Sequence, residues 1–132
     1  MRTAFVLTLL AGFLPACGSQ TVRGPDGTSL KIEEPADEQI RRGDNGRVMV
    51  WIERGNFAGE ITIRVEGLPR GVTVRNEPLV ISEFDNRITI LLHADFDAEV
   101  VSDVPVKVTA TAPNGMEVSE SFDITVHNRQ LR

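Results

Sequence analysis

Between residues 29 and 127, the chain consists of short runs in which apolar and polar residues alternate, and Gly, Pro, Asn or Asp separates one run from the next. In the clearest run, Val48, Val50 and Ile52 occupy every second position. A period of two is typical of a β-strand with one buried face. No part of this segment has the period of an amphipathic helix. The pattern therefore predicts an all-β domain.

The spacing of the runs favours two antiparallel sheets packed as a sandwich over a barrel. The predicted strands are Leu30–Glu33, Arg47–Glu53, Ile61–Glu66, Val72–Arg75, Leu79–Ser82, Arg87–His93, Val104–Ala112 and Glu117–Val126. Asn114 and Gly115 separate the last two strands and predict a hairpin with a type I′ turn, in which both residues have positive φ. We expect Trp51 to be a buried ring on an early central strand. The phenylalanines are expected to pack in the core or against loops.

A turn between two predicted strands has a characteristic sequence. Residues 67–73 read Gly-Leu-Pro-Arg-Gly-Val-Thr. Gly67 and Gly71 permit positive φ, while Pro69 fixes its own φ and interrupts strand pairing. We expect this segment to turn the chain sharply between two strands.

This corner is similar to one found in bacterial immunoglobulin-like domains, including those of the NEW3 type. Residues 48–52, 57–61 and 122–126 add to the resemblance. It implies an immunoglobulin-like antiparallel β-sandwich of about seven or eight strands over residues 29–127, followed by a short tail at 128–132. Such domains are non-catalytic spacers or binding units. The resemblance therefore implies a structural or interaction module and specifies no ligand.

The N-terminal segment has the features of an export signal. Arg2 is followed by an apolar run from Ala4 to Leu14 and then by the sequence Leu-Pro-Ala-Cys, which ends at Cys17. This segment resembles a bacterial lipoprotein signal, which implies that residues 1–16 are removed and Cys17 is acylated. The run is shorter than the about 20 apolar residues that a membrane-spanning helix needs. An ordinary secretory signal cleaved elsewhere is the alternative, and it leaves Cys17 as a free thiol.

A lipidated Cys17 would attach the protein to a membrane. By resemblance to lipoprotein sorting in bacteria with two membranes, Gly18 after the cysteine implies the outer membrane. Residues 17–28 are polar and contain several glycines, so we expect a flexible tether between the lipid and the domain. Cys17 is the only cysteine, and the folded domain therefore has no intramolecular disulfide.

Composition argues against nucleic-acid binding. The net charge of the chain is −5, and removal of residues 1–16 takes away one arginine, which makes it −6. Affinity for nucleic acid comes mainly from clustered Lys and Arg that neutralise phosphates, and the basic residues of this chain are scattered along the sequence.

Two short patterns are candidates for specific chemistry. Four carboxylates follow the strand that ends at His93, and they could supply oxygen ligands to calcium; they are Asp95, Asp97, Glu99 and Asp103. A solvated acidic loop explains the same residues without a metal. The tripeptide Arg42-Gly43-Asp44 resembles integrin-binding sequences, but composition accounts for it as a chance occurrence, and we expect a turn over residues 43–46.

No arrangement of nucleophile and base, phosphate loop or catalytic carboxylate pair is recognisable in the sequence, so we expect no enzyme activity. The sequence predicts a lipid-anchored envelope protein whose immunoglobulin-like domain binds another envelope protein through strand edges or end loops. The alternative is a carbohydrate- or calcium-dependent binding module that uses the loops around Phe57 and around residues 95–103. Exposed and coplanar phenylalanines would favour this alternative.

Overall fold

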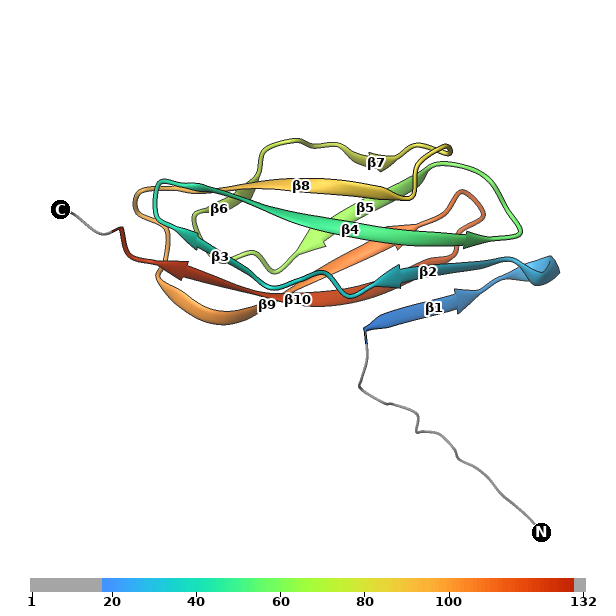
Figure 1. Cartoon of the computed structure of the whole chain (residues 1–132), viewed down its shortest axis with the longest axis horizontal. Coiled ribbons are helices and arrows are strands. Elements are labelled where there is room, and N and C mark those ends of the chain that lie inside the picture. Colours follow the sequence, from blue (N-terminus) through green and yellow to red (C-terminus); the bar gives the residue numbers. More distant parts are fainter. Residues whose placement is uncertain (1–17, 130–132) are drawn as a thin grey trace, which may run out of the picture.

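Residues 18–129 are described by the computed structural model, and they form two five-stranded β-sheets that pack face to face (Figure 1). The strands are β1 (Ser19–Arg23), β2 (Ser29–Glu33), β3 (Glu38–Arg41), β4 (Asn45–Gly55), β5 (Ile61–Glu66), β6 (Val72–Val74), β7 (Leu79–Ile81), β8 (Arg87–Ala94), β9 (Val101–Thr111) and β10 (Glu117–His127). The first sheet has the order β1-β2-β4-β8-β6 and the second the order β3-β10-β9-β5-β7. A single 3-10 turn, Pro25–Gly27, connects β1 to β2. The described part of the chain contains no helix of the length and hydrophobicity needed to cross a bilayer.

The core lies between the two sheets and follows directly from the alternation in the sequence. Along β4, Val48, Val50 and Ile52 are buried while the residues between them are exposed. The facing sheet contributes Phe122, the largest fully buried side chain. Each fully buried aliphatic or aromatic side chain stabilises the fold by about 1.5–3 kcal/mol relative to an exposed one. Apolar packing therefore holds the two sheets together.

The topology is that of an immunoglobulin-like sandwich. The order β2-β4-β8-β6 corresponds to the A-B-E-D sheet of that fold, and β5, β9 and β10 correspond to its C, F and G strands. β3 pairs with β10 in parallel, with Ile40 beside Val126, while all other pairs are antiparallel. The predicted all-β immunoglobulin-like sandwich is thus confirmed.

Two strands were not predicted. β1 lies inside residues 17–28, where the sequence suggested a flexible tether, and it pairs with β2 over its whole length, from Ser19 beside Glu33 to Arg23 beside Ser29. A paired strand therefore occupies part of the segment where the sequence suggested a tether. β1 is polar because it is an edge strand whose one partly buried side chain, Val22, packs at the margin of the core. β3 is short and buries one side chain, so its alternation is too brief to recognise.

The hairpin between β9 and β10 is confirmed, but its turn type is not the predicted one. The N–H of Gly115 donates to the carbonyl of Ala112 at 2.9 Å, and among the turn residues only Gly115 has positive φ, at 93°. This is a type I turn followed by a left-handed residue, the usual three-residue hairpin loop. Pro113 selects it, because proline at the second turn position fixes a negative φ that a type I′ turn excludes.

The corner at residues 67–73 has the predicted form. Gly67 and Gly71 both have φ of +91°. The N–H of Val72 donates to the carbonyl of Pro69 at 3.1 Å, which closes the turn immediately before β6. The glycines are therefore required by backbone geometry.

The prediction that Trp51 is buried is wrong. Its side chain is 37% exposed on the outer face of β4. The cause is strand alternation, since Val50 and Ile52 point into the core and the residue between them must point outward. A large apolar ring at an outward position therefore belongs to the surface of the first sheet.

Candidate functional site

The predicted acylation site, Cys17, lies outside the described residues. The structure describes the chain from the next residue onward. The carbonyl of Gly18 accepts a hydrogen bond from the N–H of Glu34 at 2.8 Å, and β1 begins at Ser19. The chain is therefore tied to the edge of the first sheet immediately after Cys17.

The four carboxylates of the predicted calcium site do not converge. Asp95 lies near a histidine, with 3.9 Å between its Oδ1 and Nε2 of His93. Asp103 is on β9, where its N–H donates to the hydroxyl of Thr125 at 3.0 Å. Among residues 18–129 there is no group of three His, Cys, Asp or Glu side chains placed to hold a metal ion. The structure gives no support to the calcium prediction.

Backbone hydrogen bonds hold the acidic loop in place. The N–H of Asp95 donates to the carbonyl of Gly71 at 2.9 Å, and the N–H of Glu99 donates to the carbonyl of Arg70 at 3.0 Å. The guanidinium of Arg70 also lies 3.5 Å from the carbonyl of Asp97. The loop is thus attached to the glycine corner, with its carboxylates directed to solvent.

The Arg-Gly-Asp tripeptide is part of the folded framework. The turn spans residues 41–44, with the N–H of Asp44 donating to the carbonyl of Arg41 at 3.0 Å, so the turn predicted at 43–46 is displaced by two residues. The Nε of Arg42 donates to the carbonyl of Ala98 at 2.6 Å. An arginine held in this way is not presented as a free recognition element.

The phenylalanines outside the core do not form one platform. Phe84 and Phe96 are 87% and 70% exposed, whereas Phe57 is partly buried against the core. Phe84 precedes β8 and Phe96 follows it. A strand of this length separates the two rings by roughly 25 Å. The carbohydrate-binding alternative therefore lacks the aromatic surface that would favour it.

The most distinctive surface is the outer side of two central strands of the first sheet. Met49 and Trp51 on β4 are 41% and 37% exposed, and Leu91 on the adjacent strand β8 is 39% exposed. Three arginines surround these apolar side chains. We call this surface the β4–β8 face and define it by Arg47, Met49, Trp51, Arg75, Arg87 and Leu91.

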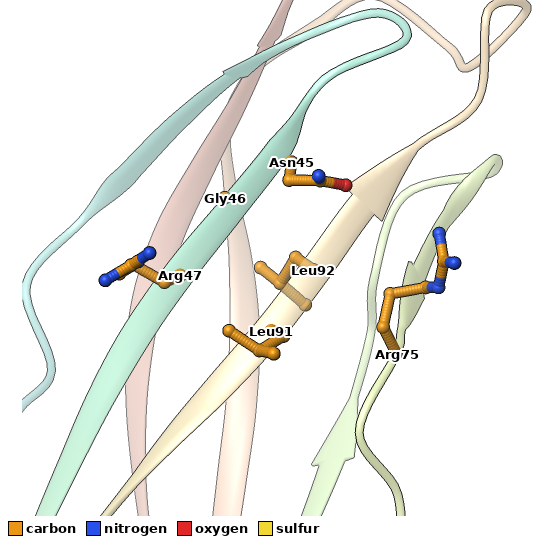
Figure 2. A pocket seen from close by; sticks show the side chains of 6 residues that line it. All are labelled: Asn45, Gly46, Arg47, Arg75, Leu91 and Leu92. Atoms are coloured by element: carbon orange, nitrogen blue, oxygen red, sulfur yellow. The ribbon is translucent and has the colours of Figure 1, made fainter.

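One row across this face places an apolar side chain between two cations. Arg47 pairs with Leu91, and the N–H of Arg75 donates to the carbonyl of Leu91 at 2.7 Å on the other side (Figure 2). Arg47 and Arg75 therefore lie on either side of Leu91, and their backbones are about 10 Å apart, which is twice the usual strand spacing. An open depression of about 410 Å³ lies over this row and is lined by Asn45, Gly46, Arg47, Arg75, Leu91 and Leu92.

The second row of the face joins a cation to an aromatic ring. Trp51 pairs with Arg87 across the sheet, and the guanidinium carbon lies 5.0 Å from the ring centroid. Within residues 18–129, no carboxylate lies within salt-bridge distance of Arg47, Arg75 or Arg87. The face therefore combines uncompensated positive charge with accessible apolar area, which suits an anionic and partly apolar ligand.

Comparison with known proteins finds similar backbone folds with low sequence identity. No protein-family model matches the chain, and no curated protein matches it. Among solved structures, a chimeric titin Z1Z2 is 13% identical with a TM-score of 0.46, covering 88% of this chain and 100% of that one. Tandem Ig repeats of Dlar are 16% identical with a TM-score of 0.46, covering 88% and 52%. The BIgI domain of beta protein from S. agalactiae, bound to CEACAM1, is 13% identical with a TM-score of 0.40, covering 78% and 99%.

The strand order defines the class as an immunoglobulin-like β-sandwich domain. Most of the β4–β8 face was not predicted as a site. The one signal in the sequence was the presence of Met49 and Trp51 at the polar positions of an otherwise regular alternation. Arg75 and Leu91 gave no such signal, because only strand pairing brings them beside Arg47.

Proposed function

We propose that this protein is a lipid-anchored component of a bacterial envelope, and that its immunoglobulin-like domain is a non-catalytic structural or interaction module. Acylation of Cys17 would provide the anchor, and Gly18 as the next residue favours the outer membrane. The supporting observation is the position of the only cysteine, which directly precedes Gly18, the first residue that the structure describes and one that is hydrogen-bonded to the domain. An acyl group at that position would hold the folded domain close to the lipid.

The surroundings of the two histidines support a non-catalytic role. Nδ1 of His93 is 2.8 Å from Oδ1 of Asn45, and Nε2 of His127 is 2.8 Å from Oε1 of Gln39. Both rings are thus oriented by side-chain amides on neighbouring strands. A histidine that activates a side-chain nucleophile would instead be hydrogen-bonded to a hydroxyl or thiol.

Analysis of the N-terminus of the purified protein tests the anchor. The full chain is expressed in a bacterium with two membranes, beside Cys17→Ala. We expect the mature wild-type chain to begin at Cys17 with a mass that includes acyl chains, and to fractionate with the outer membrane. The alanine variant should lose both properties. A mature chain with an unmodified thiol, or one cleaved elsewhere, would support the ordinary secretory signal and overturn the anchor.

The interaction role is tested by cross-linking in intact cells. The wild type should be recovered with a defined envelope protein, and Cys17→Ala should lose this partner because the domain is no longer held at the membrane. A partner recovered equally with both forms would show that binding does not need the anchor. Recovery of glycan in place of protein would favour a carbohydrate-binding module.

A further inference from the structure

The position of the proposed anchor relative to the two sheets determines which face of the domain can meet the membrane. β1 begins near the middle of the long dimension of the sandwich and lies at the edge of the first sheet (Figure 1). A lipid on Cys17 would start one residue before Gly18, which is within about 4 Å along the chain. Attachment at the middle of a side favours a domain that lies along the membrane over one that stands on its tip.

The register of the first sheet connects the anchor to the β4–β8 face. Ser19 of β1 pairs with Glu33 of β2. The residue before Glu33, Ile32, pairs with Ile52 of β4, so the antiparallel register places Glu33 beside Trp51. Trp51 is therefore two strands from Ser19, or about 10 Å at the usual strand spacing. Because Ser19 and Trp51 both lie on the outer side of the sheet, the anchor and the face are on one surface.

Charge distinguishes this surface from the opposite one. On the outer side of the first sheet, the strands carry Arg23, Lys31, Arg47 and Arg87 against Glu33 and Glu53, and Arg75 and Asp95 follow the ends of β6 and β8. Basic side chains therefore outnumber acidic ones on this side. Lys31 and Glu53 lie 3.8 Å apart and offset each other, so the positive excess comes from the arginines. The outer side of the second sheet has no such excess: Arg41, Arg64 and Lys107 against Glu66, Asp103, Glu117 and Asp123. An acidic protein thus has its positive charge concentrated beside the anchor.

We propose that the β4–β8 face rests on the surface of a phospholipid bilayer that carries anionic headgroups, with Arg47 and Arg75 binding lipid phosphates and Trp51 lying at the interface. Tryptophan is enriched at membrane interfaces, where its ring meets the headgroup region. Basic side chains near an anionic leaflet are attracted to it within a Debye length. This inference rests on the proposed lipid anchor, which would hold the domain near the membrane. It adds which face of the domain meets the lipid.

Trp51 is the only tryptophan and Cys17 the only cysteine. Tryptophan fluorescence therefore reports on Trp51 alone, and thiol chemistry attaches the chain at Cys17 alone. A chain that begins at Cys17 retains every described strand. It is coupled through the thiol to a maleimide lipid in vesicles of phosphatidylcholine with phosphatidylglycerol, and in vesicles of phosphatidylcholine alone. Tryptophan fluorescence is then quenched by acrylamide from the water phase and, separately, by phospholipids brominated near the headgroup.

On the anionic vesicles, we expect acrylamide quenching to fall at least about twofold relative to the uncoupled protein, and brominated lipid to quench the ring. The double variant Arg47→Gln/Arg75→Gln should lose most of this protection, and without coupling its affinity for anionic vesicles should drop roughly tenfold or more. Arg87 is left in place so that the surroundings of the fluorophore in the free protein do not change. The control Arg41→Gln/Lys107→Gln removes the same charge from the opposite sheet and should leave Trp51 protected.

The proposal is overturned if Trp51 is as accessible to acrylamide on anionic vesicles as in solution, or if both double variants lose protection equally. Protection that appears only after an envelope protein extract is added would assign the face to a protein partner instead. Because chemical coupling replaces the acyl group, a failure here is separate from a failure of acylation in cells, which the mass of the mature N-terminus reports.

Discussion

Gly71 combines two requirements that no other residue type meets. Its φ is +91°, and a Cβ placed on it would lie 2.6 Å from the Cα of Ala98. That contact is with backbone, so no side-chain rotation relieves it. The glycine of the corner motif is therefore fixed by both conformation and space.

Gly71→Ala is expected to destabilise the domain by about 2–4 kcal/mol, because left-handed backbone strain adds to an overpacked contact. Urea unfolding followed by Trp51 fluorescence measures the change. Gly115→Ala is the control, since Gly115 has a similar φ of +93° but no atom within 4 Å of an added Cβ. It should cost only about 1–2 kcal/mol. Equal losses would show that the contact with Ala98 does not matter.

Arg54 joins two loops at one end of the sandwich. Its guanidinium donates to the carbonyls of Gly59 at 2.8 Å, Asp85 at 2.7 Å and Ser82 at 2.8 Å. Such a planar, forked donor is particular to arginine. These three bonds hold the β4–β5 loop against the β7–β8 loop.

We expect Arg54→Lys to lower the free energy of unfolding by about 1–2 kcal/mol, since a single ammonium group cannot reach three carbonyls in this geometry. Arg64→Lys is a matched substitution in an exposed ion pair, where Arg64 lies 3.3 Å from Glu66. It should change stability by less than about 0.5 kcal/mol. Guanidinium chloride denaturation of both variants makes the comparison, and a neutral result for Arg54→Lys would mean that the loops do not depend on this side chain.

At the scale of single elements, a side chain takes the place of a strand at one edge of β8 and hydrogen-bonds to its backbone. Asn76 lies just beyond the short strand β6. Its Nδ2 donates to the carbonyl of Thr89 at 2.8 Å, and its Oδ1 accepts from the N–H of Leu91 at 3.0 Å. The amide therefore satisfies one donor and one acceptor of an otherwise open edge.

Hydrogen exchange tests this capping role. In Asn76→Ala, the amide of Leu91 loses its acceptor and should exchange roughly ten times faster or more, with a loss of stability of about 1 kcal/mol. Asn76→Asp retains an acceptor and should keep the Leu91 amide slow while losing the bond to Thr89. If the two variants gave the same exchange rate at Leu91, the side chain would not be acting as its acceptor.

β1 differs most from the expectation based on sequence. We expect amides within Ser19–Arg23 to exchange at least about tenfold more slowly than those of an unstructured peptide, because they belong to a paired strand. Exchange followed by mass spectrometry or NMR measures this directly. Free exchange throughout residues 18–23 would restore the flexible tether and would also remove the fixed position of the anchor.

The strands that sequence reasoning recovered have several alternating apolar residues, as in β4, β5 and β8. The strands that it missed have one inward apolar side chain each, Val22 in β1 and Ile40 in β3. Such strands form because a neighbouring strand offers hydrogen-bond partners, and that strand lies elsewhere in the sequence. The local pattern of apolar residues therefore cannot predict them. The same limit applies to the β4–β8 face, whose arginines become neighbours only through pairing.

At the scale of the whole molecule, the two sheets are equivalent in the core and different on their outer sides. Among the described residues, the outer side of the second sheet exposes one large apolar side chain on its strands, Val80, and its buried polar side chain, Thr109, is hydrogen-bonded to Ser119 at 2.9 Å. The first sheet exposes Trp51, Met49 and Leu91 among arginines. This asymmetry indicates that one broad side of the domain is better suited to an anionic surface than the other. The proposed anchor on that side would place the better-suited face against the membrane.

The absence of a metal-binding cluster among the described residues leads to a prediction about the stability of the whole domain. We expect the thermal midpoint to be the same, within about one degree, in calcium and in EDTA, because the carboxylates of Asp95, Asp97, Glu99 and Asp103 are separated and do not share a ligand position. A site occupied at 100 times its dissociation constant would add about 2.7 kcal/mol and several degrees for a domain of this size. Scanning calorimetry in both conditions distinguishes the cases. A rise in midpoint with calcium that Asp95→Asn and Asp97→Asn abolish would show that the acidic loop rearranges to bind the ion, and the backbone bonds from Asp95 and Glu99 to the glycine corner would then have to break.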